Sequence, residues 1–415
     1  MTDQALGDAA SLLRGTAARL LAALDRDGEE ARIVGGAIRN TLLRLAVSEI
    51  DLATTAVPEE ILHRVAEAGW KAVPTGIEHG TVTVLIGGAP LEVTTLRRDV
   101  ETYGRKAKVE FGRDWRADAE RRDFTINALS LSRDGEVHDY VGGLADLAAR
   151  RVRFIGDPAQ RIAEDYLRIL RFFRFHAWYG EGAPDAAGLH ACILARDGVE
   201  TLSRERVRTE LLKLLRAPRA TPTLAIMAET GLLGRVLGGV ALLASFENMV
   251  KVEVATDVEA DAVRRLGALA VAVKEDGERL AERLRLSNAE SQQLIALDGW
   301  WRVSPEAGMK LARELLYRLG PRHFSDRVLL AWSRSPASAA DPAWHCLARL
   351  PQKWTAPAFP LKAADFIRRG IAAGPALGAA MRSAEEAWIA ADFPRDGAVV
   401  ELIADQAAGK TSSSD

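Results

Sequence analysis

Two glycines followed by a pair of acidic residues place the strongest constraint on the fold of this chain. Segment 32–39 predicts a strand that turns at Gly35 and Gly36 into the start of a helix. Glycines at such a turn let backbone N–H groups approach a phosphate. Glu49 and Asp51 follow, alternating with apolar residues at the period of a strand, so both carboxylates are expected on one face. Such oxygen ligands suit Mg²⁺ that also contacts a substrate triphosphate.

A third acidic residue, Glu92, lies in the second of two β-branched segments. These segments, 80–86 and 90–96, flank Gly87 and Gly88, which predicts a hairpin. A carboxylate between two apolar residues is not expected to face the core without a partner. We therefore expect Glu92 to share a sheet face with the first two carboxylates and to complete a site for two metal ions. The competing interpretation is that each acid is an ordinary exposed strand residue.

Two downstream segments carry further charged side chains. Arg121 and Arg122 offer planar donor groups for phosphate. Asp123 and Asn127 are four residues apart, so they share a face if a helix begins here and can then contact a ribose hydroxyl. Segment 161–175 has apolar residues at helical spacing and contains no Gly or Pro, which predicts one amphipathic helix.

These segments together resemble the class II tRNA nucleotidyltransferases, the CCA-adding enzymes and bacterial poly(A) polymerases of the polymerase-beta-like superfamily. The chain departs from the family pattern at Asn40 and Glu49, where the family usually has Asp. A looser similarity to the tail of bacterial CCA-adding enzymes covers residues 360–388. The matching segments of residues 30–216 are, in family order, GGAIR, EIDLAT, HGTVTV, LEVTTLR, RRDFTINAL, DYVGGLADL, RIAEDYLRILRFFRF and LSRERVRTELLKLL.

The resemblance implies an α+β fold, in which an N-terminal nucleotidyltransferase head with a mixed β-sheet and helices precedes an all-helical neck, body and tail. Segment 97–120 is polar and without clear period, and we expect a mobile loop there, as in the family. The expected parts are the head at 1–155, a neck that binds the nucleotide base and RNA at 156–218, the body at 219–350, a tRNA-binding tail at 351–405 and a disordered terminus at 406–415.

The same resemblance implies that C, C and A are added to the tRNA 3′ end from CTP and ATP, with two Mg²⁺ ions. The 3′-hydroxyl attacks the α-phosphate and pyrophosphate leaves. The implied roles are catalysis and metal binding for Glu49, Asp51 and Glu92, triphosphate binding for Gly35, Gly36, Arg39, Arg121 and Arg122, ribose binding for Asp123 and Asn127, base binding for Asp165 and Arg168, and further nucleotide or RNA contacts for Arg171 and Arg174.

The base-binding pair also follows from chemistry. Asp165 and Arg168 are three residues apart, so on a helix their side chains lie side by side. Asp accepts hydrogen bonds and Arg donates them. Cytosine and adenine both present an amino donor beside a ring acceptor, whereas guanine and uracil reverse this order. The pair therefore predicts selection of C and A without a nucleic-acid template. The competing interpretation is a surface ion pair.

Composition agrees with these expectations. No stretch approaches the 18 apolar residues of a membrane span, and the N-terminus lacks the profile of a signal peptide. The two cysteines, Cys192 and Cys346, fit a reducing compartment, so we expect a cytoplasmic protein. A net charge of −2 argues against indiscriminate polyanion binding. The resemblance implies the acceptor arm and elbow of tRNA as the partner, not DNA or a membrane, and the oligomeric state stays open.

Three other functions remain open from sequence. A poly(A) polymerase shares nearly every motif. A partial enzyme that adds only CC or only A also fits, although by family analogy the long segment 97–120 argues against a CC-only enzyme. A catalytically weakened RNA-binding scaffold is suggested only by Asn40 and Glu49.

Overall fold

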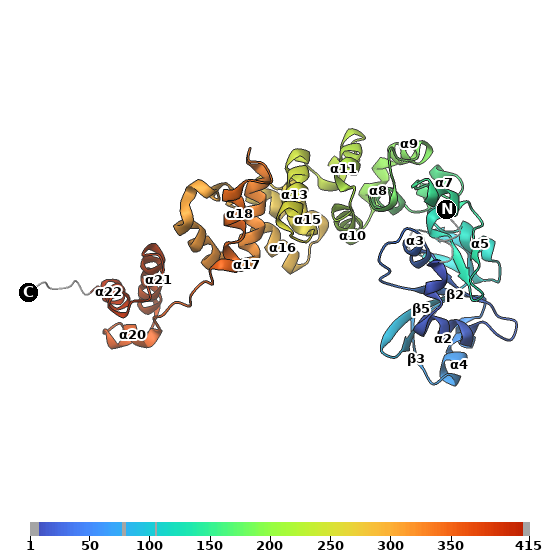
Figure 1. Ribbon diagram of the computed structural model, residues 1–415, viewed down its shortest axis with the longest axis horizontal. Helices are drawn as coiled ribbons and strands as arrows, with labels where there is room; N and C mark the ends of the chain where they lie inside the picture. The colour runs from blue at the N-terminus through green and yellow to red at the C-terminus, as the bar shows by residue number, and fades with distance from the viewer. Residues whose placement is uncertain (1–7, 77–79, 104–105, 410–415) are drawn as a thin grey trace, which may run out of the picture. The chain divides into compact units, whose positions relative to one another are not determined.

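The computed structural model describes residues 8–76, 80–103 and 106–409, with only the backbone described at 98–109. His79 of the HGTVTV segment and residues 410–415 of the expected disordered terminus lie outside the described residues. The chain divides into two compact units, Met1–Gly239 and Val240–Asp415. Figure 1 shows strands and helices in the first unit and helices alone in the second. The predicted succession of a mixed α/β head and all-helical parts is thus confirmed, and the finer domain boundaries stay predictions.

A mixed seven-stranded sheet forms the centre of the head, in the order β3-β4-β5-β2-β1-β8-β9. Strands β2 and β5 pair in parallel, and the other neighbours pair antiparallel. The predicted hairpin at Gly87 and Gly88 is confirmed, and both glycines have the positive φ of a tight turn. The strands are β1 (Ala31–Val34), β2 (Asp51–Thr54), β3 (Lys71–Gly76), β4 (Thr81–Ile86), β5 (Ala89–Thr95), β8 (Ser130–Ser132) and β9 (Val137–His138).

Side-chain alternation gives the sheet two different faces. Ile33, Leu52 and Val93 are fully buried on one face, where α2 (Gly15–Leu24) and α4 (Pro58–Glu67) pack against the strands. Residues one position along the strands point to the opposite face. Asp51 and Glu92 therefore lie on the face turned away from α2 and α4.

Segment 97–120 contains regular structure where the sequence predicts an irregular loop, and its expected mobility stays a prediction. β6 (Arg97–Tyr103) and β7 (Lys106–Phe111) pair as an antiparallel hairpin, and α5 (Trp115–Glu120) follows. The sequence did not reveal the hairpin because strand pairing uses backbone groups. Backbone pairing requires no particular side-chain pattern, so a strand can lack the apolar alternation by which strands are found in a sequence.

The rest of the first unit is helical, as predicted, but segment 161–175 is not one helix. α7 (Pro158–Glu164) ends and α8 (Leu167–Tyr179) begins around Asp165, whose backbone is extended (φ −157°, ψ 107°). The Asp165 carboxylate accepts the backbone N–H of Leu167 at 3.1 Å. An aspartate with such a local bond favours a helix start over a helix interior, which explains the break.

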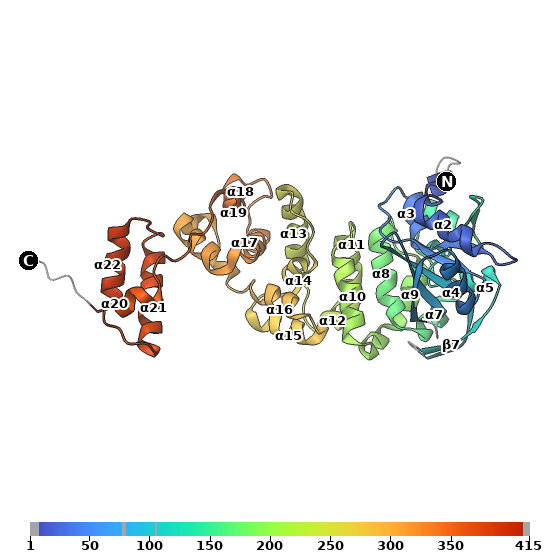
Figure 2. The ribbon, with the colours of Figure 1, turned by 90° about the horizontal axis from the view of Figure 1, so that it is seen from below.

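The first unit also contains an aromatic core. Phe124, Phe154 and Phe172 are fully or almost fully buried, and their ring centroids lie 4.9–6.3 Å apart. α8 packs against both α10 and α11 (Figure 2). The helices not yet placed are α3 (Gly36–Leu42), α6 (Gly143–Ala148), α9 (Ala186–Leu194), α10 (Arg204–Leu215), α11 (Ala220–Glu229) and α12 (Leu232–Leu237), with short 3₁₀ turns at Ala10–Leu12, Thr125–Asn127 and Arg196–Thr201.

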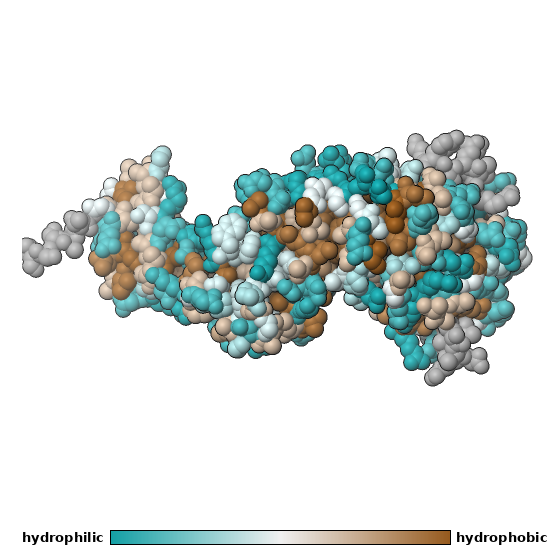
Figure 3. All heavy atoms as spheres, turned by 90° about the horizontal axis from the view of Figure 1, so that it is seen from above, coloured by the Kyte–Doolittle hydropathy of each residue, from teal (hydrophilic) through white to brown (hydrophobic). Residues whose placement is uncertain are grey.

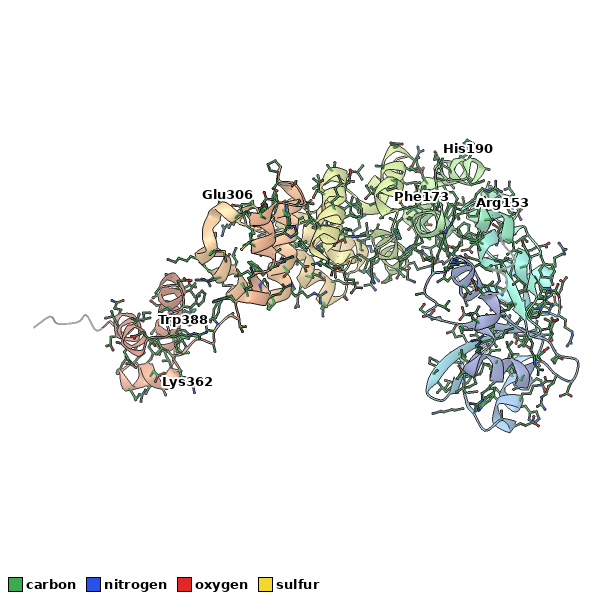
Figure 4. The ribbon with its side chains drawn as sticks, viewed as in Figure 1. Arg153, Phe173, His190, Glu306, Lys362 and Trp388 are labelled. Carbon is green, nitrogen blue, oxygen red and sulfur yellow. The ribbon has the colours of Figure 1, made fainter. Side chains whose placement is uncertain are left out.

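The second unit contains a buried charge cluster and a separate aromatic core near the C-terminus. Trp388 (labelled in Figure 4) and Phe366 are almost fully buried in that core. α17 bends at Gly320, just before Pro321, as proline in a helix requires. The helices are α13 (Leu243–Thr256), α14 (Ala262–Ala270), α15 (Lys274–Leu284), α16 (Asn288–Ile295), α17 (Gly308–Arg334), α18 (Pro342–Ala348), α19 (Leu350–Lys353), α20 (Ala363–Arg368), α21 (Pro375–Ala390) and α22 (Gly397–Ala407), with 3₁₀ turns at Trp300–Arg302 and Pro305–Ala307.

Two details of this unit differ from the expected order of parts. The short helix α19 runs across the boundary expected between the body and the tail at residues 350 and 351, and α22 continues to Ala407, past the expected end of the tail at 405. On the face shown in Figure 3, hydrophobic residues are interspersed with hydrophilic ones. Among the described residues, no helix has the length and apolar character needed to cross a membrane.

Candidate functional site

A polar cleft of about 630 Å³ in the first unit brings together most of the residues singled out in the sequence. Eleven of the fourteen predicted site residues line it, and Glu92, Arg121 and Arg174 do not. Its lining is Gly35, Gly36, Arg39, Glu49, Asp51, Arg122, Asp123, Asn127, Asp165, Leu167, Arg168, Arg171, Phe175 and Arg206.

The predicted turn from strand to helix forms one wall of the cleft. Gly35 joins β1 to α3 with φ 71° and ψ −118°, a conformation that a residue with a Cβ rarely adopts. A Cβ here would lie 3.1 Å from Arg122 Nη1 and 3.4 Å from the Asn127 carbonyl oxygen. The Gly35 N–H donates to Leu129 O at 2.9 Å. Glycine is therefore required for close packing, and the Gly35 amide is already bound within the protein.

The three acidic residues approach one another from two neighbouring strands and from the loop that precedes one of them. Asp51 is the first residue of β2 and is the register partner of Glu92 on β5. Glu49 lies in the loop before β2, so its predicted place within the strand is wrong. Burial, and then the negative charges of Glu92 and Glu49, raise the pKa of Asp51, while Arg122 opposes this rise. The three carboxylates therefore form a region of like charge.

The chemistry of these side chains fits Mg²⁺, which prefers carboxylate oxygens and would relieve their mutual repulsion. Within the described part of the chain, no three acidic, histidine or cysteine side chains are already gathered as a metal cluster. The metal role of Glu49, Asp51 and Glu92 therefore stays a prediction.

The two neighbouring arginines have different surroundings. Arg122 lines the cleft, where Nη1 donates to Asn127 O at 3.2 Å and Nη2 lies 3.2 Å from the buried carboxylate of Asp118. Arg121 Nη2 binds the same carboxylate at 2.6 Å. Arg122 is thus the better placed of the two to meet a phosphate in the cleft.

The pair expected to contact ribose is joined, although not on an α-helix. Thr125–Asn127 is a 3₁₀ turn, and Asn127 Nδ2 donates to Asp123 Oδ1 at 3.0 Å. Burial opposes ionisation of Asp123, but the charge of Arg171 and the hydrogen bonds from Asn127 and Arg171 hold its pKa below the usual value. Asp123 is thus an ionised acceptor at the cleft wall.

Arg39 is buried rather than extended into the cleft. It is 7% exposed, and its guanidinium carbon lies 4.0 Å from the ring centre of Tyr179. Its N–H groups donate to Asn127, to Asn40 and, at 2.8 Å, to the Tyr179 hydroxyl. The predicted triphosphate contact stays a prediction, and the observed bonds give Arg39 a structural role in the cleft wall.

The pair expected to read the base is separated by the helix break. Asp165 Oδ2 accepts from Arg206 Nη2 at 2.6 Å. Arg168 Nη1 donates to Arg161 O at 2.6 Å and to Glu164. The two side chains therefore do not lie side by side on one helix, and both line the cleft. Asp165 as an acceptor and Arg168 as a donor are thus held by different partners, and both remain available to a ligand in the cleft.

Several residues that complete the site were not predicted. Arg206 lines the cleft from α10, and Glu210, one turn further along that helix, is a buried partner of Arg174. The sequence did contain a signal for this pair. Arg206 and Glu210 are four residues apart in a segment of helical period, so they share one face of a helix. Leu167 and Phe175 give the cleft its apolar lining.

Comparison with known proteins connects this cleft to a family. Residues 31–153 match the model described as "Poly A polymerase head domain", and residues 190–242 match "Probable RNA and SrmB- binding site of polymerase A". The chain is 34% identical over 375 residues to mouse mitochondrial CCA tRNA nucleotidyltransferase 1, covering 88% of this chain and 83% of the relative. It is 32% identical to the CCA-adding enzyme of Limosilactobacillus fermentum, covering 87% and 89%.

Solved structures agree at the level of the fold. The crystal structure of the Bacillus stearothermophilus CCA-adding enzyme in complex with CTP matches with a TM-score of 0.74 at 24% identity, over 94% of this chain and 96% of that chain. The Thermotoga maritima CCA-adding enzyme complexed with tRNA matches with a TM-score of 0.68 at 18% identity, over 97% and 98%.

Proposed function

Since this chain belongs to the family of CCA-adding tRNA nucleotidyltransferases, we propose that it adds C, C and A to the 3′ end of tRNA from CTP and ATP. The observation that carries this proposal is the single cleft in which Asp51, Asp123 and Asp165 meet. These residues come from the motifs assigned to metal, ribose and base. In the reaction, the 3′-hydroxyl oxygen bonds to the α-phosphorus and the bond to pyrophosphate breaks.

Each wall of the cleft has a task in this scheme. Glu49, Asp51 and Glu92 would hold two Mg²⁺ ions, which lower the pKa of the attacking hydroxyl and stabilise the leaving oxygens. Arg122 supplies positive charge for the triphosphate. Arg121 lies behind it and binds the Asp118 carboxylate, which Arg122 also contacts. Asp123 and Asn127 orient the ribose, since a hydroxyl can donate to an ionised carboxylate.

Base selection rests on Asp165 and Arg168, with Arg171 beside them in the cleft. Asp165 accepts from the amino group of cytosine or adenine, and Arg168 donates to the adjacent ring nitrogen. Guanine or uracil would place a carbonyl acceptor against Asp165 and a ring N–H donor against Arg168. Each buried polar group left unpaired in this way costs about 1–3 kcal/mol. The expected RNA contacts are with the acceptor arm and elbow of tRNA, and Arg174 stays a predicted RNA contact.

The test is incubation of the purified chain with three RNAs, each with CTP, ATP or both, followed by sequencing of the products. The RNAs are tRNA lacking CCA, tRNA ending in CC, and an unstructured RNA. The proposal expects CCA on the first, A on the second and no extension of the third. Asp51→Ala serves as the inactive control.

A second candidate, poly(A) polymerase, is favoured by the family model that matches residues 31–153. Long A tails on the unstructured RNA would identify it. Addition of A alone would identify a partial enzyme, and RNA binding without transfer would identify a scaffold. A cytoplasmic location stays a prediction, because relatives include mitochondrial proteins.

A further inference from the structure

The loop between α3 and β2, which carries Glu49, is tied to the end of α3. Arg44 N donates to Thr41 O at 2.9 Å, and Leu45 N donates to Asn40 O at 2.8 Å. Arg44 has φ 57°, the left-handed conformation that usually takes glycine. These two bonds form a Schellman motif, which ends a helix and fixes the direction of the chain that follows.

Asn40 adds a side-chain bond to this turn. Its Nδ2 donates to Ala46 O at 2.9 Å. Its Oδ1 accepts from Arg39 Nε at 3.1 Å and from Arg39 Nη2 at 2.9 Å. Only a side chain with both a donor and an acceptor makes these bonds together, because a carboxylate at neutral pH accepts but cannot donate.

Packing contributes little to holding this loop. Arg44, Leu45 and Ala46 are exposed, and Leu45 is 41% exposed despite its apolar side chain. An exposed loop without buried apolar groups depends on its hydrogen bonds for a fixed position. Glu49 follows Ala46 by three residues and is itself exposed.

Asn40 also connects this loop to the opposite wall of the cleft. Arg39, which Asn40 accepts from, donates to Asn127 and contacts the ring of Tyr179. A continuous set of polar contacts therefore runs from the Asn127 amide through Arg39 and Asn40 to the backbone of Ala46.

We propose that Asn40 is a positioning residue, whose amide anchors the loop at Ala46 and thereby sets the place of the Glu49 carboxylate in the cleft. This inference rests on the proposed function, because it gives Glu49 a fixed place among the metal-binding acids. Asp at position 40 would keep the acceptor for Arg39 but would place a negative charge against the Ala46 carbonyl.

The test compares Asn40→Asp with the matched control Asn248→Asp. Asn248 Nδ2 donates to the Ser333 carbonyl at 3.1 Å in the second unit, so the control removes the same kind of bond elsewhere. Two measurements are made on the full chain: hydrogen–deuterium exchange of residues 43–50, and Mn²⁺ binding by electron paramagnetic resonance.

In Asn40→Asp we expect faster exchange over 43–50 and about a tenfold higher half-saturating Mn²⁺ concentration, the usual effect of losing a partner that orients a ligand. In Asn248→Asp both should match the wild type. Unchanged exchange in Asn40→Asp would overturn the anchoring. Three outcomes would overturn the proposal that Asn40 positions the Glu49 carboxylate. They are faster exchange with unchanged Mn²⁺ binding, equal effects in both variants, and no Mn²⁺ binding by the wild type.

Nucleotide incorporation by the same wild-type preparation separates this inference from the proposed function. If the wild type does not extend tRNA, the proposed function fails. The exchange measurement still decides whether Asn40 anchors the loop.

Discussion

Arg206 Nη2 lies 2.6 Å from Asp165 Oδ2, so a residue of α10 holds the carboxylate that we assign to base reading. The two side chains are each 18% exposed and both line the cleft. A charge-assisted bond of this kind, together with the Leu167 N–H on the other oxygen, fixes the direction of the Asp165 carboxylate. If Asp165 reads the base as we propose, base selection should depend on how α10 packs against α8, and not only on the segment that contains Asp165.

Replacing Arg206 by Ala should impair nucleotide selection. Asp165 would lose the partner that orients it, and we expect KM for CTP and ATP to rise about tenfold, the equivalent of one charged hydrogen bond. Misincorporation of UTP and GTP should increase as well. Steady-state kinetics with all four nucleotides measures this effect, and Arg133→Ala, which changes an exposed arginine outside the cleft, is the control. Wild-type selectivity in Arg206→Ala would show that Asp165 is oriented by other contacts.

Replacing Asp51 by Asn should separate catalysis from stability. Incorporation should fall by about 1,000-fold or more, as when a central catalytic group is lost. Because the pKa of Asp51 is raised in the folded protein, its ionised form opposes folding, so Asn should raise Tm at pH 7 without added metal. This gain should disappear as the pH falls through the raised pKa, where Asp51 is protonated. Calorimetry at several pH values checks the sign, and a lower Tm for the variant at pH 7 would contradict it.

His176 should make the chain sensitive to mild acid. It is 3% exposed, and burial followed by the charge of Arg219 lowers its pKa from 6.5 to about 4. Protonation is easier in the unfolded chain, so stability should be lost as the pH falls from 6.5 toward 4, by about 3 kcal/mol in all. His176→Gln should remove this part of the pH dependence in denaturation experiments. His190→Gln changes an exposed histidine and should keep the wild-type pH dependence. If the unfolding free energy of His176→Gln depends on pH as in the wild type, His176 is not the group responsible.

The buried charge cluster of the second unit should be sensitive to loss of one member. Glu253 accepts from Arg264 at 2.8 Å and from Arg265 at 2.7 Å, and Arg264 also binds Asp326 at 2.8 Å. Glu253→Gln leaves buried positive charge uncompensated and should cost about 3–5 kcal/mol.

Urea denaturation followed by tryptophan fluorescence measures this cost. The exposed pair of Glu247 and Lys251, with atoms 2.7 Å apart, provides the matched control. Glu247→Gln should cost no more than about 0.5 kcal/mol. Equal effects of the two changes would mean that burial does not set the contribution of the cluster to the free energy of unfolding.

The sequence by itself determined several of the local elements that carry the cleft residues. The double-glycine turn, the hairpin at Gly87 and Gly88, and the change to helices near residue 157 follow from local rules: positive φ for glycine, β-branched strands and helical periodicity. Those rules act over a few residues, so they can be read without knowing the partners of each segment.

The tertiary structure alone decided how the site residues are held. The parallel pairing of β2 with β5 sets Asp51 beside Glu92, and the packing of α10 on α8 brings Arg206 to Asp165, 41 positions away along the chain. The burial of Arg39 against Tyr179 and the hairpin at 97–111 were not predicted. Each depends on backbone pairing or on contacts between distant segments, whose free energy is set by the assembled protein and leaves no period in the sequence.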